Sequence, residues 1–151
     1  MRTVPVGFKT GTGSETAADL LAKLGPTLRV DIGLRSRAPP GEPPDLPAKR
    51  IRALIDTGAG AGCIDERLAE RLRLPISGKS EISGIGGRHD AFIYTARLYV
   101  PELDRLVSQS FAGVKLDEGD QWHSVILGRT FLRPYRMNYD GGTGQVEILE
   151  E

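Results

Sequence analysis

Short alternations of apolar and polar residues recur along this chain and predict strands. Between residues 27 and 35, apolar side chains at Leu28, Val30, Ile32 and Leu34 alternate with polar or small neighbours, which is the period of a half-buried strand. Further apolar runs lie at 50–56, 74–103, 107–116, 124–128 and 136–149. A proline-rich stretch at 36–49 separates the first two runs and predicts an exposed hairpin loop.

Two segments follow a helical period instead. Residues 14–25, SETAADLLAKLG, place apolar side chains at helical spacing between a candidate N-cap and a Gly-Pro stop. After a glycine-rich turn, Ile64, Leu68 and Leu72 recur at every fourth position, with acids in the first turn and arginines in the last, as the helix dipole favours. A last helical turn is expected in the C-terminal half, before Pro134 interrupts it.

Length and composition point to one β-rich domain. The 151 residues can bury a core without disulfides or a metal. Glycine (19) and proline (10) are frequent and only 6% of the residues are aromatic, which favours turns and short strands over long helices. We expect residues 1–24 to form an N-terminal extension with a short helix, and residues 25–151 to form the main domain.

The charge balance excludes some classes of partner. Lys and Arg total 20, and so do Asp and Glu, so no overall field favours a polyanion and nucleic acid is not an expected partner. The single cysteine, Cys63, agrees with a reducing compartment. No apolar segment is long enough for a signal-peptide core or a membrane span, so we expect a cytoplasmic protein without a membrane partner.

The segment ALIDTGAGAGCIDERLAERLRLP, residues 53–75, has the order of a nucleotide-binding turn: a strand, a glycine-rich loop and a helix. The dinucleotide fingerprint needs glycine at the first, third and sixth places of the turn, but the sixth place is Cys63 or Asp65, depending on the starting glycine. No Gly-Lys-Ser/Thr follows, and Asp56 would repel a phosphate. The loop therefore does not fit a nucleotide site.

Three separated motifs resemble those of the retropepsin family of aspartic proteases, the retroviral proteases and their single-domain cellular relatives. ALIDTGA at 53–59 is similar to the catalytic motif of that family. ISGIGG at 82–87, followed by FIYTARLYV, is similar to the flap hairpin that closes over substrate. VILGRTFL at 125–132 resembles the segment that crosses behind the catalytic loop, and MNYDGGTGQVEI resembles a closing hairpin. Together they cover about residues 27–149 in the order of the family.

The resemblance implies a fold and a set of site residues. The fold would be a mostly β, closed retropepsin-like barrel with one short helix in the C-terminal half, besides the N-terminal helix. Asp56, Thr57 and Gly58 would be the catalytic triplet, with Asp56 as the catalytic acid and Thr57 tying together the two loops of a dimer. The substrate contacts would be Ala59, Ile85, Gly86 and Gly87, the last three at the flap tip, and the structural positions would be Gly128 and Arg129.

Only one catalytic triplet is present, because Asp140-Gly141-Gly142 lacks the hydroxyl residue. Two carboxyl groups that share one proton are needed to activate water, so the resemblance implies a homodimer that hydrolyses polypeptides with one Asp56 from each chain. It implies no cofactor. Val146 to Leu149 are candidates for the dimer interface, because retropepsins use their terminal strands there.

The sequence also departs from the retroviral pattern. Acids that bind substrate main chain and pair with the arginine after the second motif are replaced by Gly60 and Ala61, and Gly62 stands where a hydroxyl residue is frequent. These differences leave the partner of Arg129 open. They also support an alternative: a catalytically silent retropepsin-like domain that serves as a dimerisation or peptide-binding module.

The remaining reactive side chains indicate no second chemistry. His89 and His123 have no metal-ligand spacing to each other or to a cysteine pair, so no metal is expected. Cys63 could be combined with these histidines into a thiol hydrolase, but a small buried residue at the start of the helix explains it better.

Overall fold

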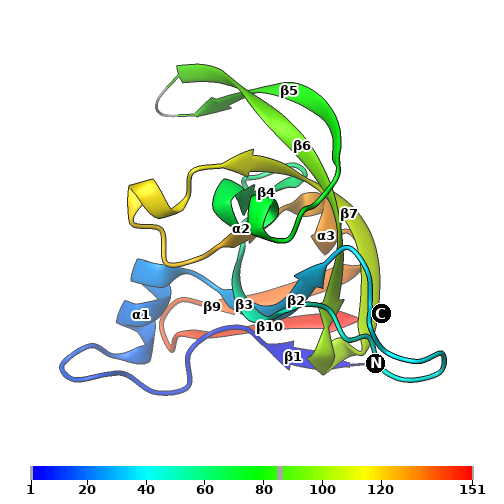
Figure 1. Ribbon diagram of the computed structural model, residues 1–151. Coiled ribbons are helices and arrows are strands. Elements are labelled where there is room, and N and C mark those ends of the chain that lie inside the picture. The colour runs from blue at the N-terminus through cyan, green and yellow to red at the C-terminus, as the bar shows by residue number, and fades with distance from the viewer. Residues whose placement is uncertain (1, 85–86, 151) are drawn as a thin grey trace.

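The computed structural model describes residues 2–84 and 87–150, and its elements are mostly strands (Figure 1). The strands are β1 (Thr3–Pro5), β2 (Thr27–Gly33), β3 (Ala48–Ile55), β4 (Gly62–Asp65), β5 (Ile76–Gly84), β6 (Gly87–Val100), β7 (Arg105–Val114), β8 (Val125–Leu127), β9 (Tyr135–Asp140) and β10 (Gln145–Glu150). The helices are α1 (Ala17–Leu24), α2 (Glu66–Arg71) and α3 (Arg129–Leu132), with single 3-10 turns at η1 (Pro101–Leu103) and η2 (Asp117–Gly119).

Six strands close a barrel. The larger sheet has the order β2-β3-β8-β4-β7-β6-β5, and β2 pairs a second time with β6. The register of β2 against β3 shifts between Val30 and Ile32, and in that region Ile32 also pairs with Leu98 of β6. At this point two residues of β3, Lys49 and Arg50, stand opposite the single residue Asp31 of β2, so β3 carries a bulge. The mostly β, closed barrel predicted from the sequence is confirmed.

The long β5–β6 hairpin, called the flap hairpin below, projects from the barrel at the top of Figure 1. Its strands pair from Ile76 and Tyr94 out to Gly84 and Gly87, so β5 is bonded along one edge only. The predicted glycine-tipped hairpin is therefore present. Two residues assigned to its tip, Ile85 and Gly86, lie outside the described residues.

A smaller sheet, β1-β10-β9, packs against the barrel core. The sequence predicts the β9–β10 hairpin but not β1, whose Val4 pairs with Ile148. Val146 and Ile148 are buried in the core, and β10 is bonded to β1 on one side and β9 on the other. Within one chain this strand therefore has no open edge for strand addition, and the suggestion that Val146 to Leu149 contribute to a dimer interface stays a prediction.

The helices are shorter than their sequence patterns. Helix α1 begins after Thr16, whose hydroxyl accepts from the Asp19 N–H while the Asp19 carboxylate accepts from the Thr16 N–H. Helix α2 begins at Glu66, so Ile64, expected in this helix, lies instead in β4, where it is fully buried. The expected turn in the C-terminal half is α3, which ends before Pro134.

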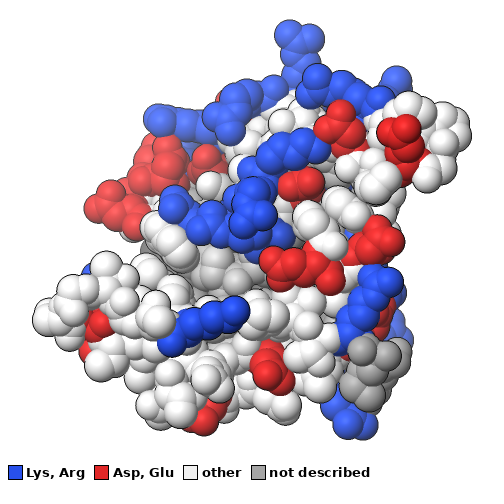
Figure 2. Space-filling model, turned by 90° about the horizontal axis from the view of Figure 1, so that it is seen from below, with Lys and Arg blue, Asp and Glu red and all other residues white. Residues whose placement is uncertain are grey.

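One continuous apolar core fills the space between the barrel, the small sheet and α1. Its members from distant segments include Val4, Leu21, Ile32, Phe111 and Ile148. On the face opposite the flap hairpin, basic and acidic side chains both gather and neither covers it, in line with the zero formal charge (Figure 2). Across residues 2–84 and 87–150, the structure has no helix long and apolar enough to span a membrane.

Candidate active site

Asp56 stands directly after β3, where the strand leaves the barrel. Strand β3 runs parallel to β8, with Ile55 opposite Leu127. The Asp56 N–H continues that ladder by donating to the Leu127 carbonyl oxygen at 2.9 Å. The backbone of Asp56 is thus held by the segment that the sequence predicts to cross behind it.

The Asp56 carboxylate is oriented by its own loop. The Gly58 N–H donates to Asp56 Oδ1 at 2.8 Å, and the Ala59 N–H donates to the Asp56 carbonyl oxygen at 3.3 Å. Asp56 is half-buried, whereas Thr57 and Gly58 are exposed. Among the described residues Oδ2 has no hydrogen-bond partner, so one carboxylate oxygen is held in place and the other is free to meet a water molecule or a second carboxyl group.

The start of α3 crosses behind the glycine-rich loop and binds its carbonyl groups. The N–H groups of Gly128, Arg129 and Thr130 donate to Ala61, Ala59 and Gly60 at 3.1, 3.0 and 3.1 Å. N–H groups at the start of a helix have no acceptor within that helix. Here they are bonded to carbonyl groups of a tight loop that also need a partner.

Arg129 adds a side-chain bond to the same loop. Its Nη1 donates to the Thr57 carbonyl oxygen at 2.9 Å. The sequence left the partner of Arg129 open, because the acids of the retroviral pattern are absent. In this chain the partner is a main-chain carbonyl oxygen. The structural role assigned to Arg129 stays a prediction.

Position 128 has no room for a side chain, because the backbone of the glycine-rich loop lies close to the Gly128 Cα. A Cβ at this position would lie 2.4 Å from the Gly60 carbonyl oxygen and 2.8 Å from those of Ala59 and Ala61. Gly62 is constrained in another way, since its φ is +151° and a Cβ would lie 2.4 Å from the Ile126 oxygen. At both positions the missing side chain makes room for backbone oxygens of the same chain.

A cavity of about 320 Å³ separates the loop from the flap hairpin. Ala59, assigned to substrate contact, lines it. Its other walls come from β5, β6 and β7: Ser80, Ile82, Ser83, Ile93, Ser110, Phe111 and Ala112. Of these, only Ile82, Ser83 and Ile93 belong to segments that the sequence singled out, ISGIGG and FIYTARLYV. The rest are brought to the cavity by the fold. Gly87 is exposed at the start of β6, paired with Gly84, and is not among the lining residues.

Cys63 also lines this cavity, from β4 and not from the helix start predicted for it. Burial and the nearby negative charge of Asp56 both raise the pKa of its thiol, burial being the larger cause. The thiol therefore stays protonated near neutral pH and is a poor nucleophile. Over residues 2–84 and 87–150, no three His, Cys, Asp or Glu side chains are grouped to hold a metal ion.

His123 lies in a buried pocket away from the loop. Its Nε2 is 2.7 Å from Thr27 Oγ1, its Nδ1 is 3.1 Å from Gln121 Oε1, and only 1% of the residue is exposed. Burial first, then the positive charges of Arg52 and Arg29, lower its pKa to about 4. It is a neutral structural histidine at physiological pH.

Comparisons with known proteins agree with this arrangement. The model of the family described as "gag-polyprotein putative aspartyl protease" matches residues 46–134, which include the loop, the flap hairpin and α3. No curated protein matches the sequence.

Two solved structures are similar at low identity. The solution structure of the simian foamy virus (mac) protease is 17% identical, with a TM-score of 0.47 over 71% of this chain and 91% of that one. The EIAV protease complexed with the inhibitor HBY-793 is 21% identical, with a TM-score of 0.48 over 72% of this chain and 85% of that one. Because the family model matches more than half of the residues, this chain belongs to the retropepsin-like gag aspartyl protease family.

Proposed function

We propose that this protein is an aspartic endopeptidase that works as a homodimer, with Asp56 of each chain forming the catalytic pair. The observation that carries the proposal is the geometry of Asp56: its backbone is bonded to Leu127, Oδ1 accepts from Gly58, and Oδ2 is unpaired among the described residues. One chain holds a single such carboxylate. A two-fold interface would bring its copy to the same axis.

The chemistry follows from two carboxyl groups that share one proton. The ionised Asp56 takes a proton from a water molecule, whose oxygen attacks the peptide carbonyl carbon, while the protonated partner donates to the carbonyl oxygen. The tetrahedral intermediate then collapses, the C–N bond breaks, and the leaving amine takes a proton from the pair. No covalent enzyme intermediate is formed, and the two carboxyls titrate as one unit.

The flap hairpin would hold an extended substrate. The cavity beneath it is lined by Ile82, Ile93 and Phe111 on one side and by the small residues of the loop on the other. An extended peptide can add to strand backbone by main-chain hydrogen bonds, while alternate side chains enter such a cavity. Closure of the hairpin would exclude water from the carboxyl pair.

The test is cleavage of unfolded casein by the parent protein and by Asp56→Asn, measured from acid to neutral pH. The chain offers a matched control in Asp140, whose Oδ1 likewise accepts from the N–H two residues on, that of Gly142, at 3.0 Å, and also from the Thr143 N–H at 3.2 Å. Asp140→Asn should cleave like the parent and Asp56→Asn should be inactive. Equal cleavage by Asp56→Asn and the parent would overturn the proposal.

A second candidate is a catalytically silent module for dimerisation or peptide binding, favoured by the small residues Gly60, Ala61 and Gly62 in place of acids. Under this alternative neither the parent nor Asp56→Asn cleaves any member of a peptide library, and both bind peptides equally. The bond from Arg129 to the Thr57 carbonyl weakens it, since the loop is secured without those acids.

A further inference from the structure

Three arginines lie close together on β2 and β3. Arg29 lies directly opposite Arg52 in the antiparallel register. Arg50 precedes Arg52 by two positions, where the register shifts and its φ is +52°, and its carbonyl oxygen accepts from Arg29 Nη1 at 3.5 Å. Their apolar neighbours Ile51 and Ala53 point the other way, toward the core. Like charges directly opposite one another destabilise a strand pair, so the sheet carries an electrostatic cost at this point.

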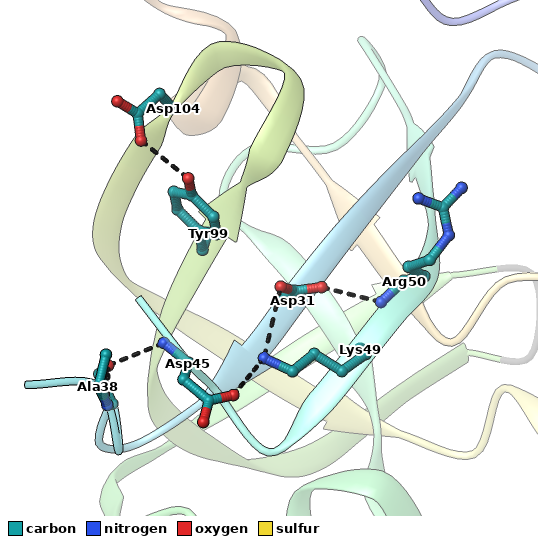
Figure 3. A network of polar contacts seen from close by, with 8 residues as sticks. Asp31, Ala38, Asp45, Lys49, Arg50, Tyr99 and Asp104 are labelled. Atoms are coloured by element: carbon teal, nitrogen blue, oxygen red, sulfur yellow. Dashed lines mark hydrogen bonds and ion pairs between the residues drawn. The ribbon is translucent and has the colours of Figure 1, made fainter. Parts of the chain in front are cut away.

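None of the three guanidinium groups has an acidic partner within the part of the chain that the structure describes. The acid on the same face, Asp31, is already engaged: it accepts from the Arg50 N–H at 2.9 Å and lies 3.8 Å from Lys49 Nζ. Figure 3 shows the Arg50 side chain extending away from this carboxylate. Burial first, then the positive charges of Arg52 and Arg50, lower the pKa of Arg29.

A tryptophan completes the cluster from a distant segment. Arg52 Cζ lies 4.4 Å from the centroid of the Trp122 ring and Arg29 Cζ lies 5.8 Å from it. The Ser124 N–H donates to the Arg52 carbonyl oxygen at 3.1 Å, which holds this loop beside β3. Stacking occupies the flat face of a guanidinium and leaves its N–H edge free for a carboxylate.

We propose that Arg29, Arg50, Arg52 and Trp122 form a docking site for an extended, acidic segment of another protein. Charge complementarity supports this occupant, since three neighbouring cations lack acidic partners among the described residues. Arg29 and Arg52 face each other across the strand pair, about 5 Å apart at their Cβ atoms, so one carboxylate can reach both guanidinium groups. An extended segment with several acids would also meet the neighbouring Arg50.

Single-stranded nucleic acid fits this surface less well. Proteins bind it by stacking bases on open aromatic rings along a basic groove. Here the one tryptophan of the chain already stacks with Arg52, and the formal charge of the protein is zero. Carboxylates need neither an open ring nor a long-range positive field.

The position of the site relates it to the proposed activity without depending on it. Arg52 precedes Asp56 by four residues on the same strand, about 13 Å. The test is therefore a binding measurement on full-length protein carrying Asp56→Asn, so that the result does not depend on cleavage. Trp122, the only tryptophan, reports binding by its fluorescence, and calorimetry serves the variants that alter its surroundings.

The probe is a (Glu-Ser)4 peptide, with (Gln-Ser)4 and a single-stranded RNA oligonucleotide alongside. We expect saturable binding of the acidic peptide alone, weakened about tenfold or more between about 20 mM and 300 mM salt. Arg29→Gln/Arg52→Gln should weaken binding about tenfold. The matched pair Arg71→Gln/Arg133→Gln, on α2 and directly after α3, removes the same charge from exposed positions elsewhere and should change binding less than twofold.

Three results would overturn the docking site: no saturable binding of the acidic peptide at low salt, equal losses in the two double variants, or tighter binding of the RNA than of the peptide. Each is separate from a failure of the proposed protease activity, because every arm uses protein in which Asp56 is already replaced.

Discussion

Arg129 and Thr57, 72 residues apart in the chain, are joined by a hydrogen bond from the guanidinium Nη1 to a main-chain carbonyl oxygen at 2.9 Å. The bond fastens the start of α3 to the loop that carries Asp56. It also explains how this chain retains the arginine after losing the acids that pair with it in retroviral relatives. The geometry of the candidate catalytic residue therefore depends on a contact between the first and third motifs.

Replacing Arg129 by Gln should loosen this loop. The side chain is exposed, so we expect a loss of about 1 kcal/mol in the free energy of unfolding, together with a fall in casein cleavage. Urea denaturation and a cleavage assay measure both. Arg133→Gln, an exposed arginine one turn further, is the control and should leave both values unchanged. Equal effects of the two substitutions would contradict a specific role for the bond to Thr57.

Gly128→Ala should disrupt the site through backbone contact. Its Cβ would lie 2.4 Å from the Gly60 carbonyl oxygen, so the loop or α3 must move. Overpacking of this kind costs about 1 to 3 kcal/mol. Thermal unfolding measures the cost, and Gly119→Ala, where no atom lies within 4 Å of the added Cβ, is the control. A melting temperature equal to that of the parent would show that the loop yields freely.

The free energy of unfolding should decrease as the pH is lowered from 6.5 to about 4, because of His123. Its pKa is lowered from 6.5 to about 4 in the folded protein, so between these values the unfolded chain binds a proton that the folded chain does not. Folding is therefore destabilised as pH falls from 6.5, by up to about 3 kcal/mol at pH 4. Urea titrations at several pH values measure this slope.

His123→Gln should flatten that slope, whereas replacing the exposed His89 should not. Exposed Asp19 and Asp45 have lowered pKa values, through hydrogen bonds with Thr16 and Lys49 respectively. Their contribution is present above the ordinary value of 3.8 and is lost below it, so it lies outside this window. An unchanged slope in His123→Gln would show that another group titrates there.

Cys63 can report the charge of Asp56. Because that charge contributes to raising the pKa of the thiol, Asp56→Asn should lower the pKa and speed alkylation of the single cysteine by iodoacetamide. Mass spectrometry follows the reaction over a range of alkaline pH. Asp140→Asn should alkylate at the parental rate. A rate in Asp56→Asn no faster than in the parent would argue against the electrostatic contact.

Cleavage should depend on dimer formation. If each chain supplies one Asp56, specific activity rises with protein concentration until the dimer saturates. Sedimentation velocity over the same concentrations gives the dimer fraction independently. Mixing the parent with excess Asp56→Asn should suppress activity through mixed dimers. Full activity in a sample that sediments as a monomer would exclude the shared catalytic pair.

The sequence by itself determined the local elements and the identity of the candidate catalytic residue. Alternation along 27–35 predicts β2, and the glycine-tipped alternation around residue 85 predicts the flap hairpin. Asp-Thr-Gly after an apolar strand predicts Asp56. The two element predictions succeed because strand period and turn chemistry depend on neighbouring residues, and the catalytic role of Asp56 stays a prediction.

Local patterns were less reliable at element boundaries. Ile64 repeats at helical spacing with Leu68, yet it belongs to β4, because pairing with Val125 of β8 satisfies its backbone and buries its side chain. The N-terminal strand β1 is too short to show a period, and it exists because β10 offers it an edge. In both cases a distant strand decided the conformation.

Tertiary structure alone decided what surrounds the site. Closure of the barrel depends on the pairing of β2 with β6, which no residue pattern marks, and the partner of Arg129 depends on how α3 meets the loop. The cluster of Arg29, Arg52 and Trp122 likewise joins three segments. The physical reason is common to all of them. Contacts between distant segments depend on strand register and on how the chain packs, and neither follows from a local pattern of residues before the whole fold has formed.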